Sequence, residues 1–406
     1  MATIRSFRAL RPADDLAEKV ASVPYDVVTT EEALQLSEGN PNSFLHIVRP
    51  EIDLPPGTDL YDDSVYEKAA ENFNRFMEKN ILVEDPEAAL YVYRLVMDGR
   101  EQIGIAGCCA VDEYNDGRIK QHEHTRKAKE DDRLRHMLTL RAHAGPVLLT
   151  FRATDDIDRL LKEETGKDPL YDFTDVDGIR HTIWKCTRSE DIENAFRDVP
   201  ALYIADGHHR AAGASRVKAE MMKSGSGKDS DSEFNYFLTV TFPSNQMAIF
   251  AYNKYITDLA GLSTGDFLDT VGDVFRIEKT EKTEPSGKGS FCMYLDGCWY
   301  ELKEKDPSPE SDPVAALDLS KFQNKLLEPI LGITDQRKDP RIDFAGGAGS
   351  PAKLKNMVDS RGGVAFTFYP VAVEELLAVA DAQMVMPPKS TWFAPKLRSG
   401  LLTHRF

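Results

Sequence analysis

A short apolar segment that runs directly into a polar motif containing glycine constrains this chain more than any other feature. Residues 201–205 read Ala-Leu-Tyr-Ile-Ala, residues 206–210 read Asp-Gly-His-His-Arg, and residues 211–218 have helical character. Five apolar residues followed by an aspartate and a glycine predict a buried strand that ends in a tight turn. The fold must therefore place this turn between the end of a strand and the start of a helix.

This order of strand, glycine and helix suits an anion-binding site. Gly207 lets the backbone approach a phosphate closely, and the first N–H groups of the following helix point at such a ligand. Asp206 precedes the turn, whereas His208, His209 and Arg210 add hydrogen-bond donors. A guanidinium can bind two phosphate oxygens at once. Two alternatives stay open: the histidines cap the helix or pack beneath it, or they bind a metal ion.

The overall charge excludes one class of partner. The chain of 406 residues carries a formal net charge of −17, so its field would repel a nucleic-acid backbone. The N-terminus lacks the apolar run of a secretion signal, and no apolar stretch is long enough to span a membrane. Five cysteines without paired spacing fit neither a disulfide framework nor a zinc site. We therefore expect a soluble cytoplasmic protein with a small-molecule substrate and neither nucleic-acid nor membrane partners.

Local signals predict a mixture of helices and strands. Capping-box patterns mark two helix starts, Thr29 with Glu32 and Ser64 with Glu67. The second helix is expected to end near Asn80 and to carry an apolar side made of Val65, Ala69, Phe73, Phe76 and Met77. Strands are predicted at 89–97, 102–110, 146–151, 235–242 and 364–369, and a helix at 125–142. The first two strands are predicted to form a hairpin through a tight turn at Asp98 and Gly99. Because strands and helices do not alternate regularly, we predict a mixed-sheet α/β fold with α+β character.

The length of the chain and its polar stretches indicate more than one lobe. A chain of this length exceeds what one compact core usually holds. Three polar stretches rich in glycine, proline and serine lie at 222–233, 281–290 and 304–313. The first of them follows the central motif directly. We therefore predict one lobe over residues 1–225, which holds the motif, and a second over residues 235–406.

Two further constellations precede the motif. At residues 24–26, Pro-Tyr-Asp predicts a turn that leaves Asp26 at a loop edge, where a helix N-cap or an Asx turn is its structural role. At residues 121–125, Gln-His-Glu-His-Thr offers Glu123 as an acidic base with histidines that tune or orient it. The H-x-H spacing also permits metal binding, although no third ligand is evident nearby. The charged run at residues 126–133 is interpreted as a solvated helix face.

The C-terminal region holds a fourth constellation. Lys389, Ser390 and Thr391 combine an ammonium with two hydroxyls, which suits a phosphate or a carboxylate. Trp392 would anchor this segment in a core, and a purely structural clasp of the tail is the alternative. Residues 343–350 are rich in glycine but lack the lysine and hydroxyl ending of a P-loop. We interpret them as a loop that approaches a ligand.

Taken together, these segments resemble a known family. Asp-Gly-His-His-Arg after an apolar strand resembles the G-x-H-R phosphate-binding signature of the ParB/sulfiredoxin-like group, which includes free serine kinases. The whole chain resembles a prokaryotic family, long described only as a domain of unknown function, in which ATP-dependent serine kinase activity has been recognised. The segments that match are 7–9, 24–27, 122–125, 205–210 and 386–396. Sulfiredoxins carry a reactive cysteine where this chain has His208, so repair of peroxiredoxins is not implied.

The resemblance implies a ParB/sulfiredoxin-like core with additional lobes, and a kinase that phosphorylates free L-serine. The donor would be ATP, or ADP, with Mg²⁺. The related small kinases place an acidic residue in their N-terminal part, so the resemblance makes Asp26 a candidate base or magnesium contact. Nucleotide binding is assigned to Asp206, Gly207, His208, His209 and Arg210, and catalysis to Glu123, Asp26 and His208. Substrate binding is assigned to Tyr25, His122, Thr125, Lys389, Ser390 and Thr391, the last three as a clasp that closes over the motif. No metal ligand is assigned. The alternative function is a nucleotide-binding regulator without phosphoryl transfer. The protein could form a homodimer.

Overall fold

The hairpin predicted at residues 89–110 lies inside the main sheet of the computed structural model, which describes residues 2–225, 231–307 and 310–406. Strands β3 (Tyr91–Met97) and β4 (Arg100–Ala110) pair antiparallel, with Met97 opposite Arg100. Asp98 and Gly99 between them have φ angles of 52° and 77°. A two-residue turn with positive φ at both positions matches the twist of paired strands, and Asp-Gly is a preferred sequence for it. The predicted hairpin is confirmed.

The chain divides into two units at a place that differs from the predicted boundary. Unit 1 comprises Met1–Met247 together with Pro395–Phe406, and unit 2 comprises Ala248–Ala394. Strand β11 (Tyr236–Pro243), which we had placed in the second lobe, is an interior strand of the main sheet of unit 1. The boundary therefore follows β11, and the polar stretch 222–233 connects two elements of one unit. Residues 226–230 of that stretch lie outside the described residues.

The main sheet of unit 1 has eight strands in the order β5-β10-β7-β11-β4-β3-β9-β8. Strand β11 runs parallel to β7 and antiparallel to β4, so the predicted mixed α/β fold is confirmed. The remaining strands of this sheet are β5 (Ile119–Lys120), β7 (Val147–Phe151), β8 (Tyr171–Thr174), β9 (Arg180–Lys185) and β10 (Leu202–Asp206). A second sheet has the order β2-β1-β20-β6, with β1 (Ala9–Pro12), β2 (Leu82–Glu84), β6 (Ala142–His143) and β20 (Thr403–Arg405).

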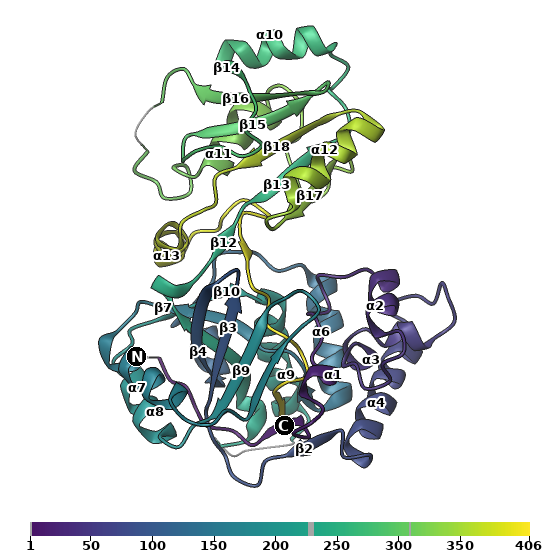
Figure 1. Cartoon of the computed structure of the whole chain (residues 1–406), viewed down its shortest axis with the longest axis vertical. Helices are drawn as coiled ribbons and strands as arrows, with labels where there is room; N and C mark the ends of the chain where they lie inside the picture. The colour runs from purple at the N-terminus through teal and green to yellow at the C-terminus, as the bar shows by residue number, and fades with distance from the viewer. Residues whose placement is uncertain (1, 226–230, 308–309) are drawn as a thin grey trace. The chain divides into compact units, whose positions relative to one another are not determined.

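Two groups of helices cover the main sheet (Figure 1). Helix α7 (Asp155–Thr165) packs on α8 (Ser189–Phe196) and contacts β3 and β4, whereas α9 (His208–Lys223) contacts β7 and β11 and packs on α6 (Lys127–Leu140). The other helices of unit 1 are α1 (Ala17–Val20), α2 (Thr30–Ser37), α3 (Leu45–Val48), α4 (Asp63–Glu78) and α5 (Val111–Asn115). Short 3₁₀ turns lie at η1 (Pro50–Asp53), η2 (Glu233–Asn235) and η3 (Ser244–Gln246).

The predicted helix starts have different outcomes. The capping box of Thr29 and Glu32 is confirmed at the start of α2. The capping box predicted for Ser64 is wrong, because the N-cap of α4 is Asp62, whose carboxylate accepts a hydrogen bond from the Ser64 N–H at 2.9 Å. A carboxylate at the N-cap satisfies the same free N–H groups as a hydroxyl would. The apolar side of α4 was predicted correctly, since Val65, Ala69, Phe73 and Phe76 are buried.

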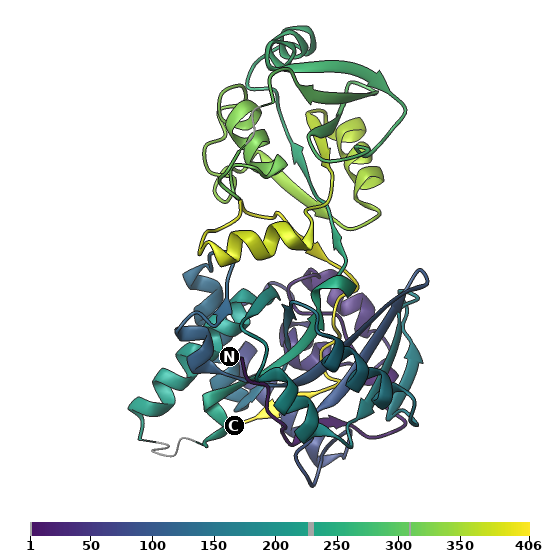
Figure 2. The same cartoon turned by 90° about the vertical axis from the view of Figure 1, so that its left-hand side faces the viewer.

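Unit 2 is built on a six-stranded antiparallel sheet in the order β14-β16-β15-β18-β13-β17. Figure 2 shows α12 on one side of this sheet and α11 on the other. Leu354 and Val358 of α12 pack on one face, and Phe322 of α11 packs on Phe366 and Phe368 of the other. The strands are β12 (Ile249–Phe250), β13 (Tyr252–Ile256), β14 (Phe275–Thr280), β15 (Ser290–Leu295), β16 (Cys298–Glu304), β17 (Ile342–Gly346), β18 (Val364–Phe368) and β19 (Trp392–Phe393), with β12 paired to β19. The helices are α10 (Thr264–Val274), α11 (Asp318–Phe322), the π-helical turn η4 (Gln323–Leu327), α12 (Ser350–Arg361) and α13 (Val373–Asp381).

The C-terminal segment is fastened to unit 1 by a buried ionic network. The Arg398 guanidinium donates hydrogen bonds to Asp175, from Nε at 2.8 Å, and to Asp177. The second partner of Asp175 is His181, at 2.7 Å from Nε2 to Oδ2, and the Tyr93 hydroxyl lies 2.7 Å from Nδ1 of the same ring. Arg398 is buried, and 9% of the Asp175 side chain is exposed. Burial alone would raise the pKa of Asp175, but His181 and Arg398 outweigh it and lower that pKa far below its usual value.

Removal of Arg398 should therefore weaken unit 1 in a pH-dependent way. Arg398→Met leaves the buried Asp175 without its charged partner, which typically costs about 3 to 5 kcal/mol. A carboxyl whose pKa is lowered by folding stabilises the fold above its unfolded pKa of about 3.9, and this contribution is lost as the pH falls below that value. We expect urea unfolding to show a lower stability for Arg398→Met at pH 7 and a smaller loss of stability than the wild type between pH 5 and pH 3.

Arg180 provides the matched control for this test. It pairs with Asp172 on the exposed edge of the same sheet, where solvent screens the interaction. Arg180→Met should therefore change stability only slightly. Equal effects of the two substitutions would contradict the assignment of the C-terminal anchor to Arg398.

Candidate active site

The central motif forms the predicted turn between a buried strand and a helix. Strand β10 is buried from Leu202 to Ala205, and α9 starts at His208 with Gly207 as its N-cap. Gly207 has a φ angle of 96°, a conformation that a residue with a Cβ rarely adopts. A Cβ atom at this position would also lie 2.9 Å from Nε of Arg210. Both the backbone angle and the close contact therefore require glycine here.

Arg210 is buried under this turn and is bound by protein groups. Its Nη1 donates to the carbonyl oxygen of Pro146, just before β7, and its Nη2 donates to Oδ2 of Asp206 at 3.0 Å. Only 6% of the residue is exposed. Nζ of Lys396 lies 3.7 Å from Oδ1 of the same carboxylate. In this arrangement Arg210 positions the turn, and its predicted bidentate grip on a phosphate would require the release of these contacts.

His208 meets the segment predicted to carry the base. The rings of His208 and His122 are 4.5 Å apart and nearly perpendicular, and both residues are buried. Nδ1 of His208 lies 3.9 Å from Oε2 of Glu123. Among the described residues, neither Nε2 of His208 nor Nδ1 of His122 has a hydrogen-bond partner. The structure thus brings the Glu123 carboxylate and two imidazoles to the start of α9. Each of these two imidazoles has one ring nitrogen without a hydrogen-bond partner among the described residues.

The histidines of the site are neutral at pH 7. Burial and the neighbouring His122 lower the pKa of His208 well below its usual value, and burial lowers the pKa of His122 to about 4. Burial and the charge of Arg126 lower the pKa of His209 to about 4. His209 Nε2 accepts a hydrogen bond from the Arg126 N–H at 3.1 Å. In this structure these histidines therefore offer hydrogen bonds without charge, in keeping with their predicted role as hydrogen-bonding groups.

Asp26 and Thr125 lie in the same region of unit 1. Asp26 is exposed in the turn after Pro24, near enough to His209 for its charge to favour protonation of that ring. The hydroxyl of Thr125 donates a hydrogen bond to Glu130 at the start of α6. Both Asp26 and Glu123 are carboxylates with access to solvent, so either could reach a ligand at the motif.

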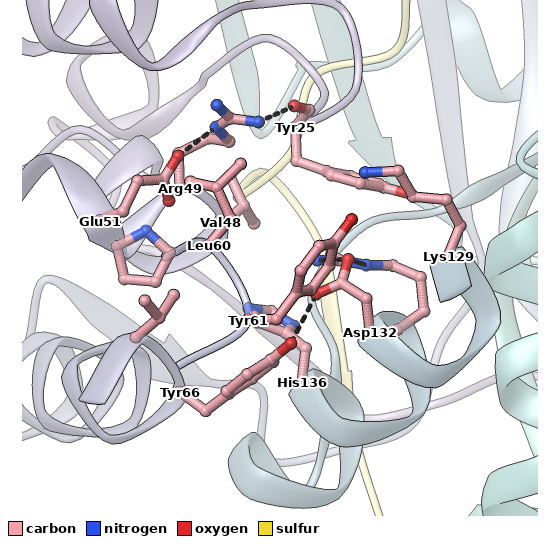
Figure 3. Close-up of a pocket in the computed structure, with 13 residues that line it drawn as sticks. Tyr25, Val48, Arg49, Glu51, Leu60, Tyr61, Tyr66, Lys129, Asp132 and His136 are labelled. Atoms are coloured by element: carbon pink, nitrogen blue, oxygen red, sulfur yellow. Dashed lines mark hydrogen bonds and ion pairs between the residues drawn. The ribbon is translucent and has the colours of Figure 1, made fainter. Parts of the chain in front are cut away.

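Tyr25 lies in a pocket beside the motif, with helix α6 as one wall (Figure 3). The guanidinium of Arg133 stacks over its ring at 3.7 Å. Arg133 and Asp132 are both buried, and Arg133 donates two hydrogen bonds to the Asp132 carboxylate, at 3.0 and 2.8 Å. The interpretation of residues 126–133 as a solvated helix face is therefore wrong for its last two members. Packing of α6 against Tyr25 and Tyr66 buries them as a pair.

The C-terminal constellation belongs to unit 2 and is described within it. Nζ of Lys389 lies 5.1 Å from the centre of the Tyr252 ring, and the buried Ser390 donates a hydrogen bond to the Pro387 carbonyl at 2.6 Å. Thr391 is half-buried beside them. Trp392 packs directly on Gly346, where an added Cβ would lie 2.2 Å from the indole. The glycine-rich loop thus accommodates a tryptophan, and the closing of Lys389 over the motif stays a prediction.

Several groups at the site were not predicted to function. They are Lys396, which pairs with Asp206, the Pro146 carbonyl, and the side chains of Lys129 and Arg133. Of these groups, only Lys396 could have been found from the sequence, since it lies in one of the segments that carry the family resemblance. In the part of the chain that the structure describes, no three His, Cys, Asp or Glu side chains gather into a metal site. None of the described helices combines the length and apolar character needed to cross a membrane.

Comparisons with known proteins identify a family and a set of distant folds. The profile of the family described as "Protein of unknown function (DUF1015)" matches residues 4–320. Among curated proteins, none matches this chain. Solved structures that resemble it include a free serine kinase in complex with AMP (13% identity, TM-score 0.36, 73% of this chain and 91% of that chain).

Two further structures have similar scores. They are a conserved hypothetical protein from Pyrococcus furiosus (15% identity, TM-score 0.36, 73% of this chain and 94% of that chain) and the C-terminally truncated SbnI from Staphylococcus aureus (12% identity, TM-score 0.39, 73% and 86%). All three scores are low, and the function proposed below does not rest on these likenesses.

The turn at Gly207 leads to a test of its geometry. Gly207→Ala should lower stability for two reasons. A left-handed backbone costs a residue with a Cβ about 1 to 2 kcal/mol, and the new Cβ would clash with the Arg210 side chain. Gly117→Ala is the matched control, because Gly117 has a φ angle of 81° and no atom within 4 Å of the added Cβ. We expect a larger drop in the thermal unfolding midpoint for Gly207→Ala. Equal drops would show that the contact with Arg210 does not constrain the turn.

Proposed function

The chain belongs to the family described as Protein of unknown function (DUF1015), and we propose that it is a phosphotransferase. In this proposal it moves the γ-phosphoryl group of ATP to the hydroxyl of a small acceptor, with free L-serine as the first candidate. The observation that carries the proposal is the left-handed Gly207 at the start of a sixteen-residue helix. It exposes backbone N–H groups beside a carboxylate and imidazoles supplied by a distant segment.

Each part of the site has a role in such a transfer. Phosphoryl transfer depends on the positioning of the reactants and on stabilisation of phosphate charge, more than on covalent chemistry by the protein. The N–H groups of α9 would bind phosphate oxygens, and the helix dipole favours the negative charge. His208, neutral and with an unused Nε2, can hydrogen-bond a phosphate oxygen. Lys396 supplies positive charge next to the turn.

A carboxylate would take the proton of the acceptor hydroxyl. Glu123 fits this role best, because it lies at His208 and is partly exposed. Asp26 is the second candidate, in the turn near His209. Asp206 is less suited, because Arg210 and Lys396 already bind its two oxygens. As one of these carboxylates takes the proton, the acceptor oxygen attacks the γ-phosphorus, the bond from this phosphorus to the bridging oxygen breaks, and ADP leaves.

Mg²⁺ is compatible with the residues present. Proteins bind Mg²⁺ through one or two carboxylates together with substrate phosphates, and the ion keeps several waters. Asp26 and Glu123 could provide such carboxylates. No cation among the described residues makes a hydrogen-bonded ion pair with Asp26, and the Glu123 side chain is only half-buried. When bound, the ion would neutralise phosphate charge. The same residues at the turn would serve ADP as the phosphoryl donor in place of ATP.

One assay separates this proposal from its main alternative. The protein is incubated with Mg²⁺, ATP or ADP, and a panel of hydroxyl acceptors that includes L-serine, and O-phosphoserine is detected by mass spectrometry. Formation of a phosphorylated acceptor supports the transferase. Tight nucleotide binding with no product from any acceptor would instead support a nucleotide-binding regulator, which the same turn would serve equally well.

The identity of the base leads to a second test. Glu123→Gln should retain nucleotide affinity and lose turnover by about 10²- to 10⁴-fold, the usual effect of removing a general base. The control is Glu71→Gln, which changes an exposed carboxylate on α4 and should leave turnover unchanged. If Asp26→Asn loses turnover and Glu123→Gln does not, the two roles are exchanged. Mild effects of both would contradict a carboxylate base at this site.

A further inference from the structure

A polar pocket next to the motif contains charged groups that have no role in the transfer described above. It has a volume of about 420 Å³, including its open mouth, and it is lined by Tyr25, by Lys129 and Arg133 of α6, and by Tyr61 and Glu51 on the facing segments (Figure 3). It shares Tyr25 and Arg133 with a neighbouring pocket that reaches Arg210. The charge of Lys129 also acts on His209. The pocket is therefore a neighbour of the motif within unit 1.

The charges of the pocket are paired, with one exception. The Asp132 carboxylate accepts hydrogen bonds from Arg133 and from the Tyr66 hydroxyl. Arg49 and Glu51 form a second pair at the other side, with 2.8 Å between Nε and Oε1. Lys129 makes no ion pair with any described residue, and its Nζ lies 5.6 Å from the centre of the Tyr61 ring. Among the side chains that line the pocket, one cation is therefore in excess, and a negatively charged ligand would balance it; the exposed carboxylate of Asp26 acts on Tyr25 and Arg133 from outside this lining.

Tyr25 adds a hydrogen-bond donor that the protein leaves unused. The residue is 9% exposed, and its hydroxyl forms no hydrogen bond with a described residue. The hydroxyl is therefore free to donate a hydrogen bond to a ligand in the pocket that Tyr25 lines. Burial raises the pKa of Tyr25, which keeps the hydroxyl protonated and able to donate. An ammonium and a phenol in one pocket are suited to a carboxylate.

We propose that this pocket binds the carboxylate of the phosphoryl acceptor, through the Lys129 ammonium and the Tyr25 hydroxyl. The identification of the ligand as the acceptor rests on the proposed function, whereas the carboxylate chemistry rests on the pocket itself. With its carboxylate held here, a hydroxy amino acid extends its hydroxyl toward His209, Glu123 and the turn. The pocket would therefore select acceptors that carry a carboxylate over amino alcohols of the same size.

Binding of two ligands that differ only in the carboxylate tests this proposal. L-serine and ethanolamine both carry a hydroxyl and an ammonium, and only L-serine has the carboxylate. Calorimetry on the full chain without nucleotide should show tighter binding of L-serine. Lys129→Met should weaken L-serine binding by about 10- to 100-fold, the range for loss of a charge-assisted hydrogen bond, and leave ethanolamine unchanged. Tyr25→Phe should weaken L-serine by about fivefold.

The control variant is Lys127→Met, on the same turn of α6. Lys127 is largely exposed and pairs with Asp131, so its loss should not change L-serine binding. Thermal unfolding of all three variants checks that the fold is retained. Unchanged L-serine binding in both Lys129→Met and Tyr25→Phe would overturn the proposal. So would a loss of ATP binding in Lys129→Met with L-serine binding intact, because Lys129 would then serve the nucleotide.

The outcomes separate this proposal from the proposed function. If L-serine binds through Lys129 but no acceptor is ever phosphorylated, the pocket stands and the transferase fails. If O-phosphoserine forms and the KM for L-serine is the same in Lys129→Met as in the wild type, the transferase stands and the pocket is overturned. If the wild-type protein binds neither L-serine nor any other small carboxylate of the panel, the pocket is overturned directly.

Discussion

The contact on which the site depends is the buried guanidinium of Arg210, held between two strands. It joins the Pro146 carbonyl, at the start of β7, to the Asp206 carboxylate, at the end of the neighbouring strand β10. A buried charge is costly unless acceptors surround it, so these two acceptors fix where the guanidinium lies. The guanidinium in turn fills the space over Gly207 that a side chain would need. The left-handed turn, the start of α9 and the position of His208 all follow from this packing.

The second constraint is the return of the C-terminus to unit 1. Residues 395–406 leave unit 2 and reach β10, where Lys396 pairs with Asp206, and end in β20 between β1 and β6. The Arg398 network fixes this segment two residues beyond Lys396. Unit 2 is therefore an insertion between β11 and the final segment of unit 1. Both connections between the units are made by short segments, and one of them carries a cation of the site.

Features set by neighbouring residues were predictable from the sequence, and features set by distant contacts were not. The turn at Gly207, the hairpin at Asp98 and the cap at Thr29 depend on local backbone preferences, and all three are present. The burial of Arg133 depends on Tyr25, more than one hundred residues away, and a run of charges gives no sign of it. The unit boundary was misplaced for the same reason, because a polar stretch in the sequence does not show which sheet the next strand joins.

Burial determines what kind of chemistry the histidines can support. Removal of an imidazole from water disfavours its charged form, and at this site nearby cations act in the same direction. The histidines are therefore hydrogen-bonding groups, and the positive charge near the turn and the pocket is that of lysines such as Lys396 and Lys129. In the proposed function, this division would let a chain with a net charge of −17 bind a small anion. The overall field repels extended polyanions, whereas a few cations held in or near partly enclosed pockets act over the short range that a single phosphate or carboxylate requires.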